Sequence, residues 1–198
     1  DPDFFGRTVL GFGLESVTSI ERFGLNIDAD IDEGRESLPT FNLSRSFVGL
    51  AYDRNTRNAL LGLDLSYREA DTFSTISEEE FLIDPNTIRQ NSGTRKTYFG
   101  GLEAAIGREA PIGASFVWAY SESTFSDTND PDITDQSNND FLGQIDFRID
   151  RRITVSPFAK YIDFDAQGKG VSRETTGFGT AVSLEVTPIT TVDLSLSH

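Results

Sequence analysis

Hydrophobic and polar residues alternate along this chain with a period of two, the period of a β-strand whose two faces meet different surroundings. In residues 112–121 the even positions are Ile112, Ala114, Phe116, Trp118 and Tyr120, and the odd positions are small and mostly polar. Nine other segments alternate in the same way: 7–16, 21–30, 44–53, 59–68, 96–107, 140–150, 153–163, 176–186 and 191–198. The pattern predicts ten strands, and no segment shows a convincing helical period.

The predicted strands are longer than ordinary ones. Each has about ten residues, whereas strands of soluble proteins average about 5–6, and a tilted strand needs about 9–11 to cross a bilayer. One face of every strand is apolar, and the opposite face carries charges of both signs in mid-strand. A strand between lipid and a polar lumen shows this pattern.

Short and long connections between the strands alternate in order. The short ones are 17–20, 54–58, 109–111, 151–152 and 187–190, and the long ones are 31–43, 69–95, 122–139 and 164–175. An up-and-down membrane barrel has short turns at one rim and long loops at the other. The predicted fold is therefore all-β, an antiparallel up-and-down transmembrane β-barrel.

Aromatic residues on the apolar face gather at the long-loop ends of the strands. Amphipathic rings favour the headgroup level of a membrane, so these positions are predicted to form an aromatic girdle. The girdle positions are Tyr67, Tyr98, Trp118, Tyr120, Phe141, Tyr161 and Phe178.

The polar face supplies the residues expected to line the lumen. They are Arg22, Asp28, Asp64, Arg68, Glu103, Asp146, Arg148, Lys160 and Glu185. Arg22, Arg68, Arg148 and Lys160 are expected to pair with the carboxylates of this set. Such a network would fill a narrow barrel, whereas a wider barrel would leave a water path.

Charge restricts the partners of the chain. The formal net charge is −15 and the pI is near 4.3, which argues strongly against binding of nucleic acid. The expected partners are outer-membrane lipid and lipopolysaccharide, with a second copy of the chain or another envelope protein as further candidates. Most acidic residues fall in the long loops, where divalent cations are candidates for bridging carboxylates to lipid phosphates. Residues 127–135 offer several oxygen ligands but lack EF-hand spacing, so no dedicated metal site or cofactor is predicted.

Residues for catalysis are scarce. The chain has no cysteine, and its one histidine is His198, so a nucleophilic triad has no candidate base. No enzymatic activity is predicted.

The direction of the strands leads to an expectation about size. The first predicted connection is short, which places both ends of a ten-stranded chain at the long-loop rim, whereas outer-membrane barrels keep their termini at the short-turn rim. We therefore expect residues 1–198 to form a single barrel domain that is an internal part of a barrel of twelve or more strands.

The chain resembles the porin-like outer-membrane β-barrel proteins of Gram-negative bacteria. The resemblance is carried by residues 4–32, 50–71, 107–132 and 175–198, for example GREAPIGASFVWAYSESTFSDTNDPD. The resemblance covers essentially the whole chain and consists of a repeated hairpin pattern, with no catalytic signature. It implies a location in the bacterial outer membrane and a barrel fold.

Three functions remain open. The leading one is a porin-like passive channel for small hydrophilic solutes with modest cation preference. The second is a non-conducting structural barrel whose acidic loops bind an envelope partner or surface polymer. The third is a soluble, secreted β-sandwich or barrel.

Overall fold

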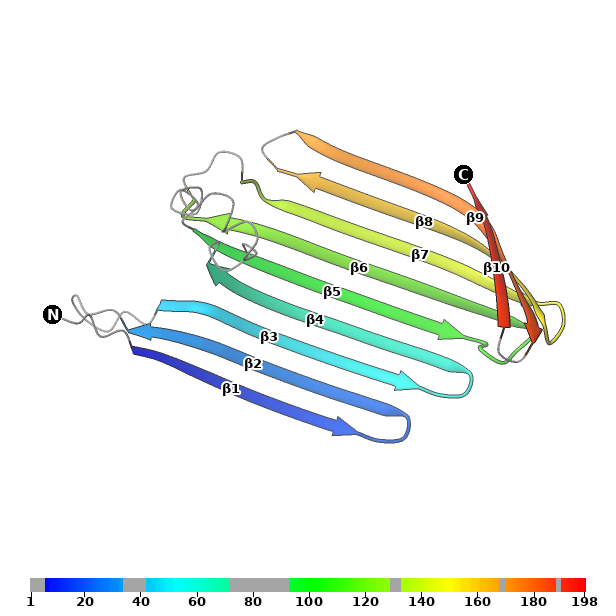
Figure 1. Ribbon diagram of the computed structural model, residues 1–198, viewed down its shortest axis with the longest axis horizontal. Helices are drawn as coiled ribbons and strands as arrows, with labels where there is room; N and C mark the ends of the chain where they lie inside the picture. The colour runs from blue at the N-terminus through cyan, green and yellow to red at the C-terminus, as the bar shows by residue number, and fades with distance from the viewer. Residues whose placement is uncertain (1–5, 34–41, 72–92, 129–132, 168–169, 188–189) are drawn as a thin grey trace.

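Ten strands form one antiparallel sheet in which each strand pairs with the next along the chain (Figure 1). The computed structural model describes residues 6–33, 42–71, 93–128, 133–167, 170–187 and 190–198. The strands are β1 (Gly6–Val17), β2 (Glu21–Glu33), β3 (Asn42–Asn55), β4 (Ala59–Asp71), β5 (Thr94–Ile106), β6 (Ile112–Ser126), β7 (Gln136–Arg148), β8 (Ile153–Ala166), β9 (Val171–Thr187) and β10 (Thr190–Ser197). The described residues contain no helix of the length and apolarity that a membrane span requires.

All ten predicted strands are confirmed, but most of them extend further than predicted at the long-loop rim. β6 continues to Ser126 instead of 121, and β8 continues to Ala166 instead of 163. The predicted long connection 164–175 is wrong, because only residues 167–170 separate β8 from β9. The alternation of apolar residues stops before the strand does, since a backbone ladder needs no apolar side chain to continue.

Three strands end earlier than predicted: β5 at Ile106 instead of 107, β10 at Ser197 instead of 198, and β7 at Arg148 instead of 150. The difference is largest in β7. The side chain of Asp150 accepts hydrogen bonds from the backbone N–H groups of Arg152 at 2.6 Å and Ile153 at 2.9 Å. An aspartate that bonds backbone groups just ahead of it favours a turn over a continued strand.

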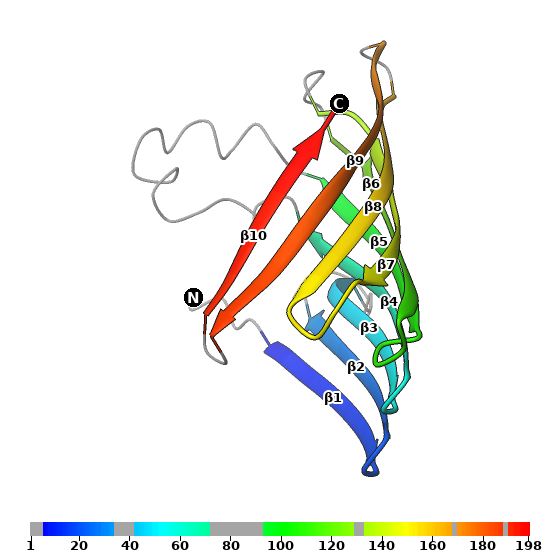
Figure 2. The ribbon, with the colours of Figure 1, turned by 90° about the vertical axis from the view of Figure 1, so that its right-hand side faces the viewer.

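The strand register separates two faces across the whole sheet. On one face, Leu14 lies opposite Leu25, Leu25 opposite Leu50, and Leu50 opposite Leu65. On the other face, Arg22 lies opposite Asp53. We call the first the outer face and the second the trough face, because the sheet curls into an open trough (Figure 2).

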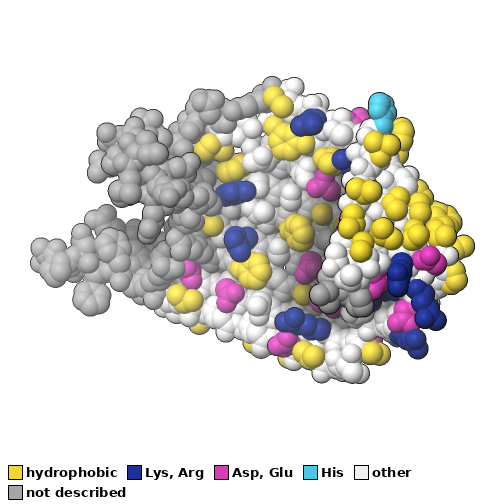
Figure 3. Space-filling model, turned by 45° about the vertical axis from the view of Figure 1, so that its right-hand side comes forward, with side chains coloured by type: hydrophobic (Ala, Val, Ile, Leu, Met, Phe, Trp, Pro, Cys, Tyr) yellow, Lys and Arg dark blue, Asp and Glu magenta, His cyan; other side chains and the backbone are white. Residues whose placement is uncertain are grey.

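The trough face encloses a hollow of about 820 Å³ over β1–β5. Charged side chains of both signs are spread across the trough in Figure 3, and hydrophobic side chains gather around the end of the sheet that carries His198. The described strands form one sheet with no second sheet packed against it. A soluble sandwich, which needs two facing sheets, therefore has no counterpart here.

The sheet has no hydrophobic core of its own. None of the described hydrophobic side chains is buried, and Ile112, Ile106 and Leu196 on the outer face expose 62%, 66% and 80% of their surface. Each large apolar side chain left in water forgoes about 1.5–3 kcal/mol of burial free energy. A sheet of this kind needs an apolar medium or a partner over its outer face.

Phenylalanine rings on the trough face lie over glycines. A Cβ atom added to Gly49 would meet the ring of Phe47 at 2.7 Å, and one added to Gly101 would meet Phe99 at 3.3 Å. Phe158 lies in the same way over Gly179 of the neighbouring strand. These glycines leave room for rings that would otherwise stand in the trough.

This close packing predicts different outcomes for two glycines of the trough face. Gly49→Ala should lower the free energy of unfolding by about 1–3 kcal/mol, because the new Cβ atom overlaps the Phe47 ring. Gly24→Ala should be neutral or slightly stabilising, because no atom lies within 4 Å of its added Cβ. Urea unfolding in detergent micelles, followed by Trp118 fluorescence, measures both. Equal effects of the two substitutions would contradict the packing described.

Candidate functional site

All nine predicted lumen residues lie on the trough face. The register places Asp28 beside Gly11, Asp64 beside Gly101, and Glu103 beside Gly62. Arg68, Asp146, Arg148, Lys160 and Glu185 occupy the same side of β4, β7, β8 and β9. The nine residues therefore share one face of the sheet, and their role in lining a lumen stays a prediction.

The ion pairs predicted among these nine residues are wrong. Arg22 pairs instead with Glu15, with Nε 3.0 Å from the carboxylate, and the guanidinium of Arg68 lies 5.5 Å over the ring of Phe47. Arg148 donates to the backbone carbonyls of Gly107 and Ala110. These three arginines bind acceptors or rings on their own or a nearby strand, because the open trough keeps its two sides too far apart for pairing across it.

The carboxylates on the trough face fall into two groups. Asp146 accepts hydrogen bonds from Gln144 at 2.6 Å and from Ser156 at 2.7 Å. Asp64 and Glu103 are exposed and pair with no basic group among the described residues. Asp53 is also exposed and lies near the position of a Gly62 Cβ. These three carboxylates give the wall of β3–β5 a negative surface.

The predicted girdle residues form a row on the outer face. The rings of Tyr67 and Tyr98 are 5.1 Å apart between centroids. Phe141 contacts Trp118 and Tyr161, with both centroid distances at 6.4 Å. Phe178, on the next strand, lies 6.3 Å from the ring of His198. The row crosses several strands near their middle and not at their loop ends, because the strands continue beyond it: Trp118 lies six residues from Ile112 and eight from Ser126.

The polar atoms of the row are bound to partners near the loop rim. The indole N–H of Trp118 donates to Asn139 at 2.7 Å, and the hydroxyl of Tyr120 donates to Glu122 at 2.9 Å. Tyr67 donates in the same way to Glu69, two residues closer to the loops. Rings with an apolar body and a satisfied polar end suit a boundary between apolar and wet surroundings.

Backbone hydrogen bonds join neighbouring turns at the opposite rim. Asn55 N donates to Ile20 O at 2.8 Å, and Arg108 N donates to Asn58 O at 3.3 Å. Two further bonds continue the series: Arg148 N donates to Pro111 O at 2.9 Å, and Glu185 N donates to Arg152 O at 2.8 Å. We call this series the turn rim. It connects the described parts of the short turns into one continuous edge.

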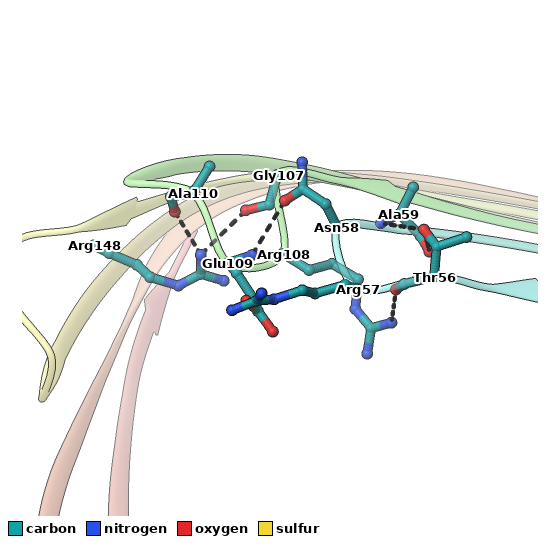
Figure 4. Close-up of polar contacts among 9 residues, drawn as sticks. All are labelled: Thr56, Arg57, Asn58, Ala59, Gly107, Arg108, Glu109, Ala110 and Arg148. Carbon is teal, nitrogen blue, oxygen red and sulfur yellow. Dashed lines mark hydrogen bonds and ion pairs between the residues drawn. The ribbon is translucent and has the colours of Figure 1, made fainter. Parts of the chain in front are cut away.

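Side chains reinforce the centre of the turn rim (Figure 4). Arg57 pairs with Glu109 of the next turn, and Arg108 Nη1 donates to Asn55 Oδ1 at 2.5 Å. Gly107 adopts a φ of +69°, which turns its carbonyl oxygen to within 3.1 Å of Arg148 Nη1. The sequence GREAP at 107–111 signals this turn, but nothing in the sequence signals its bonds to the turns on either side.

The described residues contain no ready-made cluster for a metal ion. No group of three or more His, Asp or Glu side chains there is arranged to hold a metal ion. Residues 129–132, in the predicted acidic cluster, lie outside the described residues. Asp135, from the same cluster, accepts a hydrogen bond from the backbone N–H of Phe125 at 2.7 Å.

Comparison with models of protein families and with curated proteins finds no match. The function is therefore argued from the two faces and two rims alone. Those features separate an apolar outer face from a charged hollow, and they place a row of aromatic rings across the outer face and linked turns at one rim.

The turn rim predicts a large effect of one arginine and a small effect of its neighbour. Arg148→Ala should lower the free energy of unfolding by about 1.5–3 kcal/mol, because the carbonyls of Gly107 and Ala110 lose a charged donor. Arg151→Ala removes an exposed side chain from the turn that follows Arg148 and should change the free energy of unfolding by less than about 0.5 kcal/mol. Urea titration measures the free energy of unfolding of both variants. An unchanged free energy of unfolding for Arg148→Ala would show that the hydrogen bonds of Arg148 at the turn rim add no stability.

Proposed function

We propose that this chain forms the wall of a porin-like β-barrel in the outer membrane of a Gram-negative bacterium, passing small hydrophilic solutes. The observation that carries the proposal is the polarity of the sheet. Its outer face carries exposed large hydrophobic side chains on every strand except β8, whereas charged groups line the hollow of the trough. Acyl chains would cover the first face and water the second.

The rims support a membrane setting. The aromatic row crosses the outer face, and its hydroxyl and indole groups are bound on the loop side of the rings to Glu122, Glu69 and Asn139. Such rings mark the headgroup level of a bilayer. Lipid and lipopolysaccharide are accordingly the proposed partners of this face.

The two edge strands support a larger barrel. β1 and β10 do not pair with each other, so the sheet is open at both edges. Unpaired backbone N–H and C=O groups cost several kcal/mol each in hydrocarbon. In a membrane these edges require further strands, and we propose a complete barrel of twelve or more.

The charges of the trough support a modest preference for cations. Asp53, Asp64 and Glu103 are exposed without a basic partner among the described residues. Arg22 is paired with Glu15, whereas Arg148 keeps its charge while it donates to carbonyl oxygens. Together with Glu15 and Asp53, the predicted lumen residues comprise seven carboxylates and four bases, and a wall with an excess of carboxylates attracts cationic solutes.

A matched pair of substitutions tests the assignment of the faces. Leu65 lies on the outer face and Ser66 on the trough face of β4. Leu65→Arg should cost about 2–4 kcal/mol of stability in lipid vesicles, the cost of arginine facing the bilayer interior, and Ser66→Arg should cost much less. Urea unfolding from vesicles measures both. A chain that stays monomeric in detergent-free buffer would contradict the membrane assignment.

Conductance in planar bilayers tests transport. The full-length protein should show single-channel steps and a reversal potential that favours cations. Asp64→Lys should lower the cation-to-anion permeability ratio by about threefold or more, because it reverses a charge on the lumen wall. Asp165→Lys, the same change on the outer face, should leave the ratio nearly unchanged. Absence of channel steps, or anion selectivity in the unmodified protein, would refute the porin proposal.

A second candidate is a structural barrel that does not conduct and whose acidic loops bind an envelope partner. The observation in its favour is the set of phenylalanines on the trough face, which the sequence pattern did not indicate. They are Phe47, Phe99, Phe125, Phe158 and Phe164. The conductance measurement decides between the two candidates.

A further inference from the structure

A small pocket of about 180 Å³ lies on the trough face near the loop rim. It is separate from the large hollow over β1–β5, and its residues come from β5, β6, β7 and β8. The residues that give it its chemistry are Arg95, Ser121, Ser123, Gln136, Asn138 and Phe164. The pocket thus contains one cation surrounded by hydroxyl and amide groups.

The guanidinium of Arg95 is held in place but incompletely bonded. Its Nη2 donates to Ser123 Oγ at 3.1 Å, and its central carbon lies 5.7 Å over the ring of Phe125. Its Nε is buried and has no hydrogen-bond partner. A buried N–H group without a partner is rare in proteins, since it gives up its bond to water without replacement.

The surroundings of Arg95 favour an anion. No Asp or Glu is among the described residues that line the pocket, whereas the trough wall of β3–β5 carries three free carboxylates. The acidic groups beside the pocket already accept hydrogen bonds: Asp140 from Asn138 at 2.7 Å, and Asp135 from the backbone N–H of Phe125 at 2.7 Å. Ser123 is only 6% exposed, so the site is built into the wall.

We propose that this pocket binds a small oxyanion, a carboxylate or phosphate group, through the free N–H groups of Arg95. A planar guanidinium offers parallel N–H donors that match two oxygens of such a group. The hydroxyl of Ser121 and the amide of Gln136 supply further donors at the edge of the pocket. Only one of the five N–H donors of Arg95 is hydrogen-bonded among the described residues, which leaves donors on its Nη atoms for an oxyanion.

This proposal goes beyond the channel function and does not depend on it. A cation-preferring lumen with one anion site near its loop rim would hold back anionic solutes that enter from that side. Binding can be measured in detergent micelles, where no conductance is needed. Failure of the anion site would therefore leave the porin proposal intact, and the reverse also holds.

Isothermal titration calorimetry of the full chain in micelles tests the site, with inorganic phosphate and acetate as separate probes. At least one probe should bind to the unmodified protein. Arg95→Gln should weaken that binding about tenfold or more, because charged hydrogen bonds are lost. Lys96→Gln removes the same charge from the adjacent residue on the opposite face, and should change the affinity by less than about twofold.

Arg95→Lys separates recognition by the guanidinium from a simple effect of charge. It keeps the positive charge and should still lose most of the affinity, because an ammonium has no planar pair of donors. Circular dichroism confirms that each variant keeps its sheet, and the lysine variant serves if the glutamine variant does not fold. Binding of phosphate alone or acetate alone identifies the ligand class. No binding of either probe, or full binding by Arg95→Lys, would overturn the proposal.

Discussion

One constraint governs this structure: the sheet buries none of its described hydrophobic side chains against other parts of the same chain. In a soluble protein the apolar side of a sheet packs on a second layer, and that packing supplies most of the driving force for folding. Here the second layer is absent from the described strands, so the driving force must come from whatever covers the outer face. The aromatic row and the long apolar strands are features of a sheet whose outer face must be covered by an apolar medium or a partner.

The side chains of the trough face, unlike those of the outer face, find partners within the sheet, because this face is concave and carries charged groups. Its basic groups bind the nearest acceptor on the wall, as Arg22 does with Glu15 and Arg148 with the carbonyl of Gly107. Its rings lie flat over glycines, as Phe47 does over Gly49. The base–acceptor contacts and the ring–glycine contacts both hold side chains close to the sheet, so they leave the centre of the trough open.

The strands and their faces were predictable from the sequence because the two-residue period is a direct record of which side each residue faces. Leu65 and Ser66 could be assigned to opposite faces from their positions alone, and the register confirms that assignment. The partner of Arg148 could not be predicted, since it depends on the φ of Gly107 in a turn far along the chain. The pocket at Arg95 was also missed, because its residues come from four strands and share no spacing in the sequence.

Hydrogen bonds between neighbouring hairpins hold the wall together at both of its ends. Along the turn rim they run from Asn55 at one side to Glu185 at the other, and each fixes the separation of two hairpins. At the loop end, Gln167 N–H donates to the carbonyl of Asp135 at 2.8 Å and Phe125 N–H donates to its carboxylate at 2.7 Å. A change in the curvature of the wall therefore has to be shared among several hairpins, because no hairpin with such a bond can tilt without moving its neighbour.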